Sequence, residues 1–374
     1  MMDIEGKYGK AKVFTDQIEV TAIEQVKELC DQPWTKKLPI RIMPDCHTGK
    51  GCVIGLTMPI TDTVVSNLVG VDIGCGMEVA KIDIKEMNFK KVDKAIRSRV
   101  PAGREIRKKP HPLNKHIDLT QLYCWPSIKQ HEERIQNSLG TLGGGNHFIE
   151  INQDEAGYHY VVIHSGSRQL GTLVANHYQR IAQQRLAKSS KKAENLPPNY
   201  LAPLTGVDMQ HYLHDLLIAQ QYAELNRIAM MQVIIEELGV EVLQQWTTIH
   251  NYVEPAKIPM LRKGAIAAHK DELVIIPLNM KDGSIIGIGK GNPDWNESAP
   301  HGAGRLMSRT TAKENISLDD YIKIMEGVYS TSISHHTLDE APMAYKDKEV
   351  ILKSIHDTVE IVEIIKPVYN FKAT

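Results

Sequence analysis

The sequence predicts an α/β fold, because strand-like and helical patterns alternate along the chain. Residues 10–20 and 41–58 are typical of strands, whereas apolar residues recur at helical spacing through residues 207–238. Gly239 follows this longest helical pattern, and glycine is a residue at which helices commonly end. The other predicted elements are helices at residues 22–30 and about 348–357 and an apolar strand that ends near Lys372.

Composition indicates a globular protein with a large core. The chain has 374 residues, of which 42% are hydrophobic, and its length alone permits two or three domains. The net charge of −1 provides no overall basic field, so binding to phosphates would need a local basic patch. No apolar run is long enough to span a bilayer, and the first residues lack the apolar region of a signal peptide. Five cysteines without regular spacing indicate a reducing compartment, so we expect a cytoplasmic protein.

The glycine-rich segment 69–77 is the first candidate for a functional site. It places the Asp72 carboxylate three residues before the Cys75 thiol, and the surrounding glycines allow a compact turn. A thiolate beside a carboxylate suits a divalent transition metal, but two ligands are too few for a closed site. Further ligands would have to come from later in the chain. Alone, this segment favours the alternative of a buried structural thiol.

Three histidines lie where predicted strands begin or end. His147 follows the glycine-rich segment 140–145, whose backbone N–H groups can bind phosphate oxygens, and precedes a strand. His164 ends an apolar strand and is followed by small residues and Arg168, and His250 ends a third strand-like stretch. One histidine at a strand end is commonplace. Several of them, in a chain whose carboxylate and thiol lack partners, are candidates for the missing ligands.

Two other groups resemble metal ligands. Residues Asp45, Cys46 and His47 are adjacent in the sequence, and adjacent side chains rarely converge on one ion, so we expect the segment that contains them, residues 43–51, to form a turn packed against segment 69–77. His211, His214 and Asp215 share one face of the long predicted helix, but no matching third ligand follows downstream, so we discount them.

Two segments are predicted to lie at the surface. Residues 101–118 are rich in basic side chains and form the best local candidate for contacts with a phosphate backbone, although an ordinary solvated loop is the alternative. The basic residues of this segment are Arg104, Arg107, Lys108, Lys109, His111, Lys115 and His116. Residues 188–206 are predicted to form a mobile surface insertion.

His301 is the candidate nucleophile. It is followed by Gly302, Ala303 and Gly304, which leave room for a phosphate, and by Arg305, whose guanidinium can bind phosphate oxygens. These are the requirements of a phosphoryl or nucleotidyl acceptor. The alternative is a helix start with a surface arginine.

Together, these segments resemble the RtcB family of RNA ligases. Each motif is weak alone, but their combination is specific, and they follow the family order across nearly the whole chain. The matching segments are residues 43–51, 67–77, 140–150, 164–168, 250–251, 262–265, 301–305 and 340–346.

The resemblance implies GTP- and Mn(II)-dependent joining of an RNA 3′-phosphate or 2′,3′-cyclic phosphate end to a 5′-hydroxyl end. The reaction would pass through a histidine–GMP intermediate and an RNA 3′ end capped with GMP, in RNA repair or tRNA splicing. The partners implied are tRNA or damaged structured RNA and an accessory activator protein. His301 would be the guanylylated nucleophile, and the basic residues in contact with phosphates would be Arg168, Lys263 and Arg305.

The resemblance also implies a site for two Mn(II) ions and a guanine nucleotide. The first ion would be bound by Asp72, Cys75 and His147, and the second by Cys75, His164 and His250, with Cys75 bridging them. The nucleotide would be surrounded by Asn146, His147, Phe148, Ile149, Glu150, His250, Asn251, Pro277, Leu278, Asn279, Met280, Ser284, His301, Gly302, Ala303, Gly304, Tyr345 and Lys372.

These implied ligands are spread along the chain, so we expect one RtcB-like domain over residues 1–374, with mixed β-sheets flanked by helices. The chain is shorter than many members of the family, and residues 277–283 read Pro-Leu-Asn-Met-Lys-Asp-Gly where longer members have Pro-Gly-x-Met-Gly, so nucleotide selectivity could differ there. Two rival interpretations use the same metal ligands: a metal-dependent phosphoesterase and a non-catalytic RNA-binding factor. Neither needs a nucleophile at His301.

Overall fold

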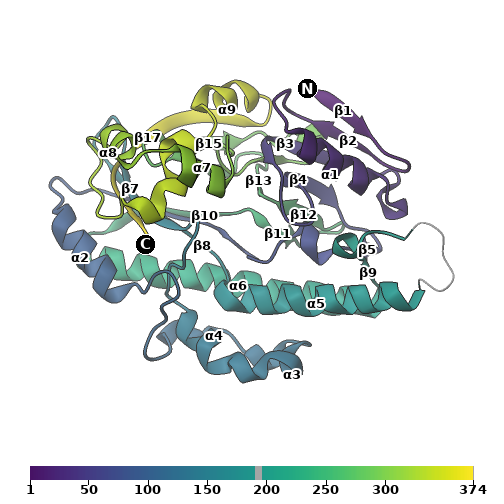
Figure 1. The fold of residues 1–374 in the computed structure, drawn as a ribbon. Coiled ribbons are helices and arrows are strands. Elements are labelled where there is room, and N and C mark those ends of the chain that lie inside the picture. The colour runs from purple at the N-terminus through teal and green to yellow at the C-terminus, as the bar shows by residue number, and fades with distance from the viewer. Residues whose placement is uncertain (190–195, 374) are drawn as a thin grey trace.

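Two large sheets organise residues 1–189 and 196–373, which the computed structural model describes (Figure 1). The six-stranded sheet has the order β1 (Met2–Glu5), β2 (Lys10–Val13), β3 (Ile40–His47), β4 (Ile54–Pro59), β12 (Met260–Lys263), β11 (Asn251–Glu254). The seven-stranded sheet has the order β10 (Val242–Ile249), β6 (Gly76–Ile82), β8 (His159–Ser165), β7 (Phe148–Gln153), β17 (Val359–Lys372), β15 (Gly283–Gly289), β14 (Leu273–Asn279). Two short pairs complete the described strands: β13 (Ala265–Ala267) with β16 (Ser298–Pro300), and β5 (Thr63–Val64) with β9 (Leu204–Thr205).

Helices flank these sheets. Their bounds are α1 (Val20–Cys30), α2 (Phe89–Arg99), α3 (Trp125–Ile128), α4 (Glu132–Ser138), α5 (Arg168–Ser189), α6 (Gly206–Leu238), α7 (Arg309–Asn315), α8 (Leu318–Ile324) and α9 (Lys348–Ser354). The two longest, α5 and α6, run side by side (Figure 1). Among the described residues, no helix combines the length and the apolar character needed to cross a membrane.

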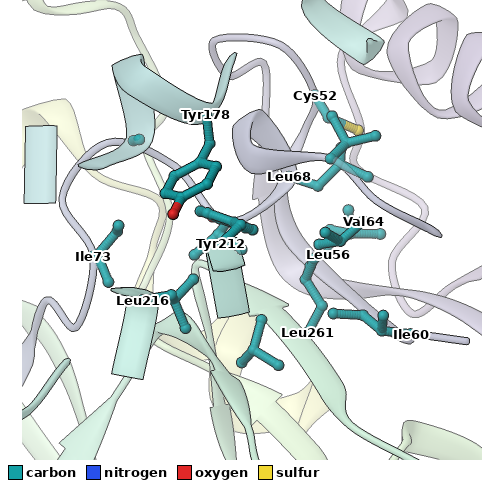
Figure 2. Packing of buried hydrophobic residues seen from close by; sticks show 14 of the residues in the cluster. Cys52, Leu56, Ile60, Val64, Leu68, Ile73, Tyr178, Tyr212, Leu216 and Leu261 are labelled. Carbon is teal, nitrogen blue, oxygen red and sulfur yellow. The ribbon is translucent and has the colours of Figure 1, made fainter. Parts of the chain in front are cut away.

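Helix α6 contributes to the cores of both large sheets. Tyr212 and Leu216 on α6 pack with Tyr178 on α5 in the cluster that also contains Leu56 of β4 and Leu261 of β12 (Figure 2). The rings of Tyr178 and Tyr212 lie 5.2 Å apart between centroids. The C-terminal half of α6 packs instead against the seven-stranded sheet, with Met230 and Ile234 in one cluster with Ile149, Val161 and Ile163. The same helix therefore helps to fix the position of both sheets.

The predicted fold class is confirmed, and the differences in detail have local causes. The parallel pairing of β2 with β3, among otherwise antiparallel pairs, makes the six-stranded sheet mixed. The strand predicted over residues 10–20 ends at Val13, because the Thr15 hydroxyl accepts a hydrogen bond from the Gln17 backbone N–H and turns the chain. Gly239 ends α6 with a φ of +64°, as the sequence predicts.

Part of the predicted insertion at residues 188–206 lies outside the described residues, namely 190–195. Its following segment belongs to the packed body of the protein. Leu201 and Leu204 are buried in the same cluster as Tyr178, and β9 pairs with β5. The mobility of the insertion stays a prediction.

An ion-pair cluster at the edge of the six-stranded sheet gives a test of stability against pH. His269 Nε2 lies 2.7 Å from Glu254 and Nδ1 lies 2.6 Å from Glu297, so both ring nitrogens donate to carboxylates. Burial lowers the pKa of His269, but the hydrogen bonds to the two carboxylates outweigh burial and raise that pKa above its usual value.

We expect His269→Gln to lower stability by about 0.5–1 kcal/mol at pH 5.5, because the histidine is partly exposed and its ion pairs are screened by solvent. A histidine whose pKa is higher in the folded than in the unfolded protein stabilises the fold fully at pH values below its unfolded-state pKa of about 6.5. This contribution is lost as the pH rises through the pKa of the folded state. The difference in free energy of unfolding between variant and wild type should therefore be smaller at pH 9 than at pH 5.5. Urea unfolding at the two pH values measures this difference. If the difference is the same at both, the protonated ring is not the source of the stabilisation.

Candidate functional site

The candidate metal ligands meet at one end of four neighbouring strands. In the order of the sheet, His250 directly follows β10, Cys75 directly precedes β6, His164 lies near the end of β8, and His147 directly precedes β7. The strand register pairs Ile249 with Gly76, and His164 with both Met77 and Phe148. Antiparallel pairing thus brings segments up to 175 residues apart to a single edge of the sheet.

The ligand atoms of this group are within bonding reach of a shared metal. Cys75 Sγ lies 3.2 Å from His164 Nε2 and 3.5 Å from His147 Nε2. His164 Nε2 lies 3.3 Å from His250 Nε2, and His147 Nε2 lies 2.9 Å from the Asp72 carboxylate. Cys75, His147 and His164 form a candidate metal site, with their ligand atoms all within 4.8 Å of one another.

Hydrogen bonds to backbone carbonyls orient two of these histidines. His147 Nδ1 donates to the Leu142 carbonyl and His164 Nδ1 to the Asn146 carbonyl, so each ring turns its Nε2 atom toward Cys75. Burial, together with the neighbouring histidines, lowers the pKa of His164 well below its usual value, so this ring is neutral. Nitrogen, sulfur and oxygen atoms thus converge here in contacts of 2.9–3.5 Å, and a metal ion bound among them would satisfy this arrangement.

Asp72 is held close by the chain itself. Its carboxylate packs against Gly166, where an added Cβ would lie 2.2 Å from a carboxylate oxygen, so the close approach requires a glycine. Burial raises the pKa of Asp72, but the hydrogen bond and charge of His147 and the charge of Arg168 outweigh it and hold the pKa below its usual range. Burial and Asp72 raise the pKa of the Cys75 thiol well above its usual value, and metal coordination deprotonates such a thiol.

His301 lies beside this ligand group. It follows β16, and its ring centroid is 4.8 Å from that of His250. The buried carboxylate of Asp45 accepts hydrogen bonds from His301 Nδ1 at 2.6 Å and from the His301 backbone N–H at 3.1 Å. Asp45 thereby engages Nδ1, fixes the orientation of the imidazole and leaves Nε2 as the ring nitrogen that is free to meet a ligand.

These residues line a cavity of about 300 Å³. Of the predicted residues, the cavity is lined by Asp72, Cys75, Asn146, Phe148, Glu150, His164, His250, Asn251, Pro277, Leu278, Asn279, Met280, His301, Gly302, Ala303, Gly304, Arg305, Tyr345 and Lys372. Its lining therefore joins the ligand group, the candidate nucleophile and a third group around Glu150 and Lys372 in one space.

Comparison with known proteins decides the family. The model of the family described as tRNA-splicing ligase RtcB matches residues 25–124 and 124–373. The chain belongs to the RtcB family.

Relatives in this RtcB family come from bacteria and archaea. The chain is 34% identical to the RNA-splicing ligase RtcB of Escherichia coli (strain K12), over 95% of each chain. It is 28% identical to the tRNA-splicing ligase RtcB of Aeropyrum pernix, over 84% of this chain and 83% of the relative. It is 24% identical to the tRNA-splicing ligase RtcB of Methanococcus maripaludis, over 96% and 92%. The similarity thus extends over almost the whole length of the E. coli protein.

Some predicted residues of this RtcB-family chain lie outside the cavity lining. His147, Ile149, Ser284, Arg168 and Lys263 are in this group. Lys263 is buried, and its ammonium donates to the carbonyls of Lys50, Cys52 and Asn67 at 2.7–3.1 Å. Burial lowers the pKa of Lys263 to about 8. The predicted phosphate-binding lysine thus has its three donors directed at the backbone.

Arg168 also has partners outside the cavity. It begins α5 with a φ of +54° and donates to the Thr141 hydroxyl at 3.2 Å and the Gly103 carbonyl at 3.3 Å. An added Cβ on Gly143 would lie 1.9 Å from the guanidinium, so the glycine-rich segment makes room for this side chain. Arg168 therefore ties the His147 loop to the basic loop at residues 101–118.

Several lining residues of the cavity belong to a charge network centred on the buried carboxylate of Glu340. Its carboxylate accepts from Arg305 and Arg309 at 3.3 Å each, from Lys372 at 2.9 Å and from Tyr345 at 2.7 Å. Burial raises the pKa of Glu340, but the charges of Lys372 and Arg309 outweigh it, so the carboxylate stays ionised. Three cations are thus held at the cavity wall, where an anionic ligand would meet them.

Sequence reasoning missed several members of the lining: His47, Ile54, Met77, Gly264, Gly283, Arg309 and Asn370. Arg309 follows Arg305 by four residues, a spacing that could have signalled a second phosphate contact. Asn370 lies two residues before Lys372 on β17, so the period of a strand places both on one face. His47 was considered only as a metal ligand, and the remaining apolar and glycine positions carry no chemical signal in the sequence.

The turn predicted for residues 43–51 is only partly observed. Residues 43–47 belong to strand β3, because the chain continues in β structure with a bulge between Ile42 and His47 where it pairs with β4, whereas residues 48–51 lie between the two strands. Asp45 consequently points at His301 instead of at a metal. The discounted Asp215 is a structural group: its carboxylate accepts from the backbone N–H groups of Tyr123 and Cys124 and from the Tyr178 hydroxyl.

Proposed function

We propose that this chain is an RNA ligase that uses GTP and two Mn(II) ions to join RNA 3′-phosphate or 2′,3′-cyclic phosphate ends to 5′-hydroxyl ends. The observation that carries the proposal is the position of His301. Its imidazole is oriented by a buried carboxylate and lies directly beside a group of metal ligands. The E. coli and archaeal relatives, which are named RNA-splicing or tRNA-splicing ligases, support the same reaction class.

In this proposal Asp72, Cys75 and His147 hold one ion and Cys75, His164 and His250 hold the other. Bound there, the ions would supply charge neutralisation at the phosphate oxygens of the nucleotide. The Nδ1 hydrogen bonds of His147 and His164 to backbone carbonyls would hold their rings in the orientation that a metal ligand needs. Cys75 must stay a reduced thiol for this role, which supports our expectation of a cytoplasmic protein.

His301 performs the covalent step. Its Nε2 attacks the α-phosphorus of GTP, so that an N–P bond forms and the P–O bond to pyrophosphate breaks. The RNA 3′-phosphate then takes GMP from the histidine, and a cyclic phosphate end is first hydrolysed to that phosphate. The 5′-hydroxyl finally attacks the capped 3′ phosphate, forms the phosphodiester and releases GMP. In this proposal Arg305 and Arg309, which contact Glu340 at the cavity wall, bind the phosphates.

The guanine base would lie at the wall formed by β7 and β17. Glu150 is buried there and accepts from the Asn370 amide at 2.8 Å, and burial raises its pKa to about 7. The Asn370 Oδ1 atom has no hydrogen-bond partner among the described residues. A buried acceptor and a carboxylate side by side suit the N–H groups on one edge of guanine.

Labelling with GTP tests the proposal against its rivals. The protein is incubated with α-labelled GTP and Mn(II), denatured and separated, and the expected result is label on the chain through an acid-labile bond to histidine. A metal-dependent phosphoesterase would hydrolyse its substrate without carrying label. An RNA-binding factor would bind RNA and neither carry label nor join ends.

The basic loop at residues 101–118 is proposed to add sequence-independent affinity for RNA. It lies next to the His147 loop, because Gly103 donates to the Gly143 carbonyl at 2.9 Å and accepts from Arg168. Lys108 and Lys109 are exposed on it. We expect Lys108→Glu with Lys109→Glu to weaken RNA binding. The slope of log affinity against log salt should fall by about one unit for each phosphate that the loop no longer neutralises.

Filter binding at a series of salt concentrations measures this slope. The matched control reverses Lys36 and Lys37, an exposed pair outside the cavity lining, and should leave the slope unchanged. If the Lys108 and Lys109 variant keeps both the affinity and the slope of wild type, the loop is only a solvated surface.

A further inference from the structure

We propose that Asn226 and Arg227, two consecutive residues of α6, position the loops that carry the metal ligands. Both side chains are fully buried. They do not line the cavity, so they act on the reaction through other residues. The inference rests on the proposed metal-binding role of Asp72, Cys75, His147, His164 and His250.

Asn226 connects two ligand loops. Its Oδ1 accepts from the backbone N–H groups of Gly140 and Thr141 at 2.8 and 3.0 Å, at the start of the glycine-rich loop that ends in His147. Its Nδ2 donates to the Thr141 carbonyl, to the Ser165 hydroxyl and to the Gly166 carbonyl at 3.0–3.1 Å. One amide thus uses both of its ends to hold the segments before His147 and after His164 at a fixed separation.

The network from Asn226 reaches the ligands themselves. The Ser165 hydroxyl, which accepts from Asn226, donates to the Leu142 carbonyl at 2.8 Å. The same carbonyl accepts from His147 Nδ1 at 2.8 Å, and so it fixes that ring. Gly166, the other acceptor, packs directly against the Asp72 carboxylate. A change at Asn226 would therefore shift groups that set the orientation of two ligands.

Arg227 connects the third loop to the same point. Its Nη1 donates to the Gly74 carbonyl at 2.7 Å and to the Ser165 carbonyl at 3.0 Å, one residue from Cys75 and one residue from His164. Its Nη2 donates to the Thr247 hydroxyl at 3.3 Å, on the strand that leads to His250. A single planar guanidinium thus spans the segments that carry three ligands.

The burial of Arg227 is unusual for a residue that only packs. Among the described residues its hydrogen-bond partners are two backbone carbonyls and one hydroxyl, no carboxylate forms an ion pair with it, and the charge of Glu78 only partly offsets the cost of burying the guanidinium. Carbonyl oxygens of the ligand loops receive its N–H groups instead. Apolar residues could fill this volume at less cost, so the guanidinium and the adjacent amide are best explained by the geometry that they impose on the loops.

Binding of Mn(II) alone tests this inference. Asn226→Asp keeps the size and the acceptor but loses the Nδ2 donor, and we expect its Mn(II) dissociation constant to rise about 10- to 100-fold. Arg227→Met should weaken binding to a similar extent, and Arg227→Lys should recover part of the loss because it keeps a buried donor and its charge. The measurements are competition titrations of Mn(II) on the full chain and the melting temperature without metal. Absorption of the Co(II)-substituted protein reports the thiolate–metal bond.

Asp215→Asn is the matched control. It is another isosteric change at a fully buried residue of α6 that holds backbone N–H groups, about 16 Å along the helix from Asn226. Its partners, Tyr123 and Cys124, belong to no ligand loop. The control should lower the melting temperature and leave the Mn(II) dissociation constant within about twofold of wild type.

The outcomes separate this inference from the metal assignment. Weaker Mn(II) binding and a shifted Co(II) spectrum in Asn226→Asp, at a melting temperature similar to that of the control, support the positioning role. Wild-type affinity and spectrum in both Asn226→Asp and Arg227→Met overturn it, whatever their melting temperatures. If Asn226→Asp does not fold, the comparison of Arg227→Met with Arg227→Lys decides in the same way. A wild-type chain that binds no Mn(II) overturns the metal assignment and this inference with it.

Discussion

His301→Ala is expected to form no enzyme–GMP adduct and to lower the joining of 3′-phosphate and 5′-hydroxyl RNA ends by about 10⁴-fold or more. The imidazole is the proposed nucleophile, so the substitution removes the atom that would bond to phosphorus. Mn(II) binding should persist, because His301 is not among the proposed ligands. The measurements are label transfer from α-labelled GTP, ligation of RNA ends and Mn(II) titration. His336→Ala, a change at an exposed histidine, is the control and should behave as wild type.

RNA that already carries a 3′-GMP cap makes this test more specific. The cap replaces the product of the two steps that need His301, so His301→Ala should join capped RNA to a 5′-hydroxyl end. Failure on capped RNA would mean that the imidazole also acts in the last step. Wild-type protein that joins ends without ever carrying GMP on histidine would refute the covalent mechanism.

Cys75→Ala is expected to lower bound Mn(II) from about two ions to less than one ion per chain, because a bridging thiolate serves both positions. His147→Ala and His250→Ala should each remove mainly one ion, since each imidazole faces only one of the proposed positions. Elemental analysis after gel filtration measures the occupancy.

Cys30→Ala is the matched control for this series. It removes a thiol that is equally buried but lies in the apolar cluster of α1, and its Mn(II) content should equal that of wild type. Two ions in Cys75→Ala, or the loss of both ions in His250→Ala alone, would rule out the bridged arrangement.

The candidate ligand group could be predicted from the sequence because its members lie at the ends of strands. His147, His164 and His250 each adjoin an apolar run, and the edges of neighbouring strands are where side chains from distant segments meet. The role of Asp45 was not accessible in this way, since its partner His301 is 256 residues away, and β3, which carries Asp45, belongs to a different sheet from β16, which His301 directly follows. Their proximity depends on how the sheets pack.

The roles of buried polar groups were also difficult to predict from the sequence. Asn226 and Arg227 lie inside a helical pattern that reads as amphipathic, and nothing in their spacing distinguishes them from surface residues. Lys263 shows the converse case, a basic residue in a family motif whose ammonium bonds the backbone. In both cases the partners are carbonyl groups, which every residue has and which no sequence pattern marks. That residues 1–374 form one domain stays a prediction.

The strand register at His164 has a consequence for how errors in folding are rejected. Side chains alternate between the two faces of a sheet, so a slip of β8 by one residue against β6 and β7 would turn His164 away from Cys75 and His147. A misaligned chain could keep most of its backbone hydrogen bonds and still lose the ion. Because binding to one state alone stabilises that state by mass action, metal in the cell would add its binding free energy only to chains in the correct alignment. Metal binding would thus favour the strand register on which the metal site itself depends.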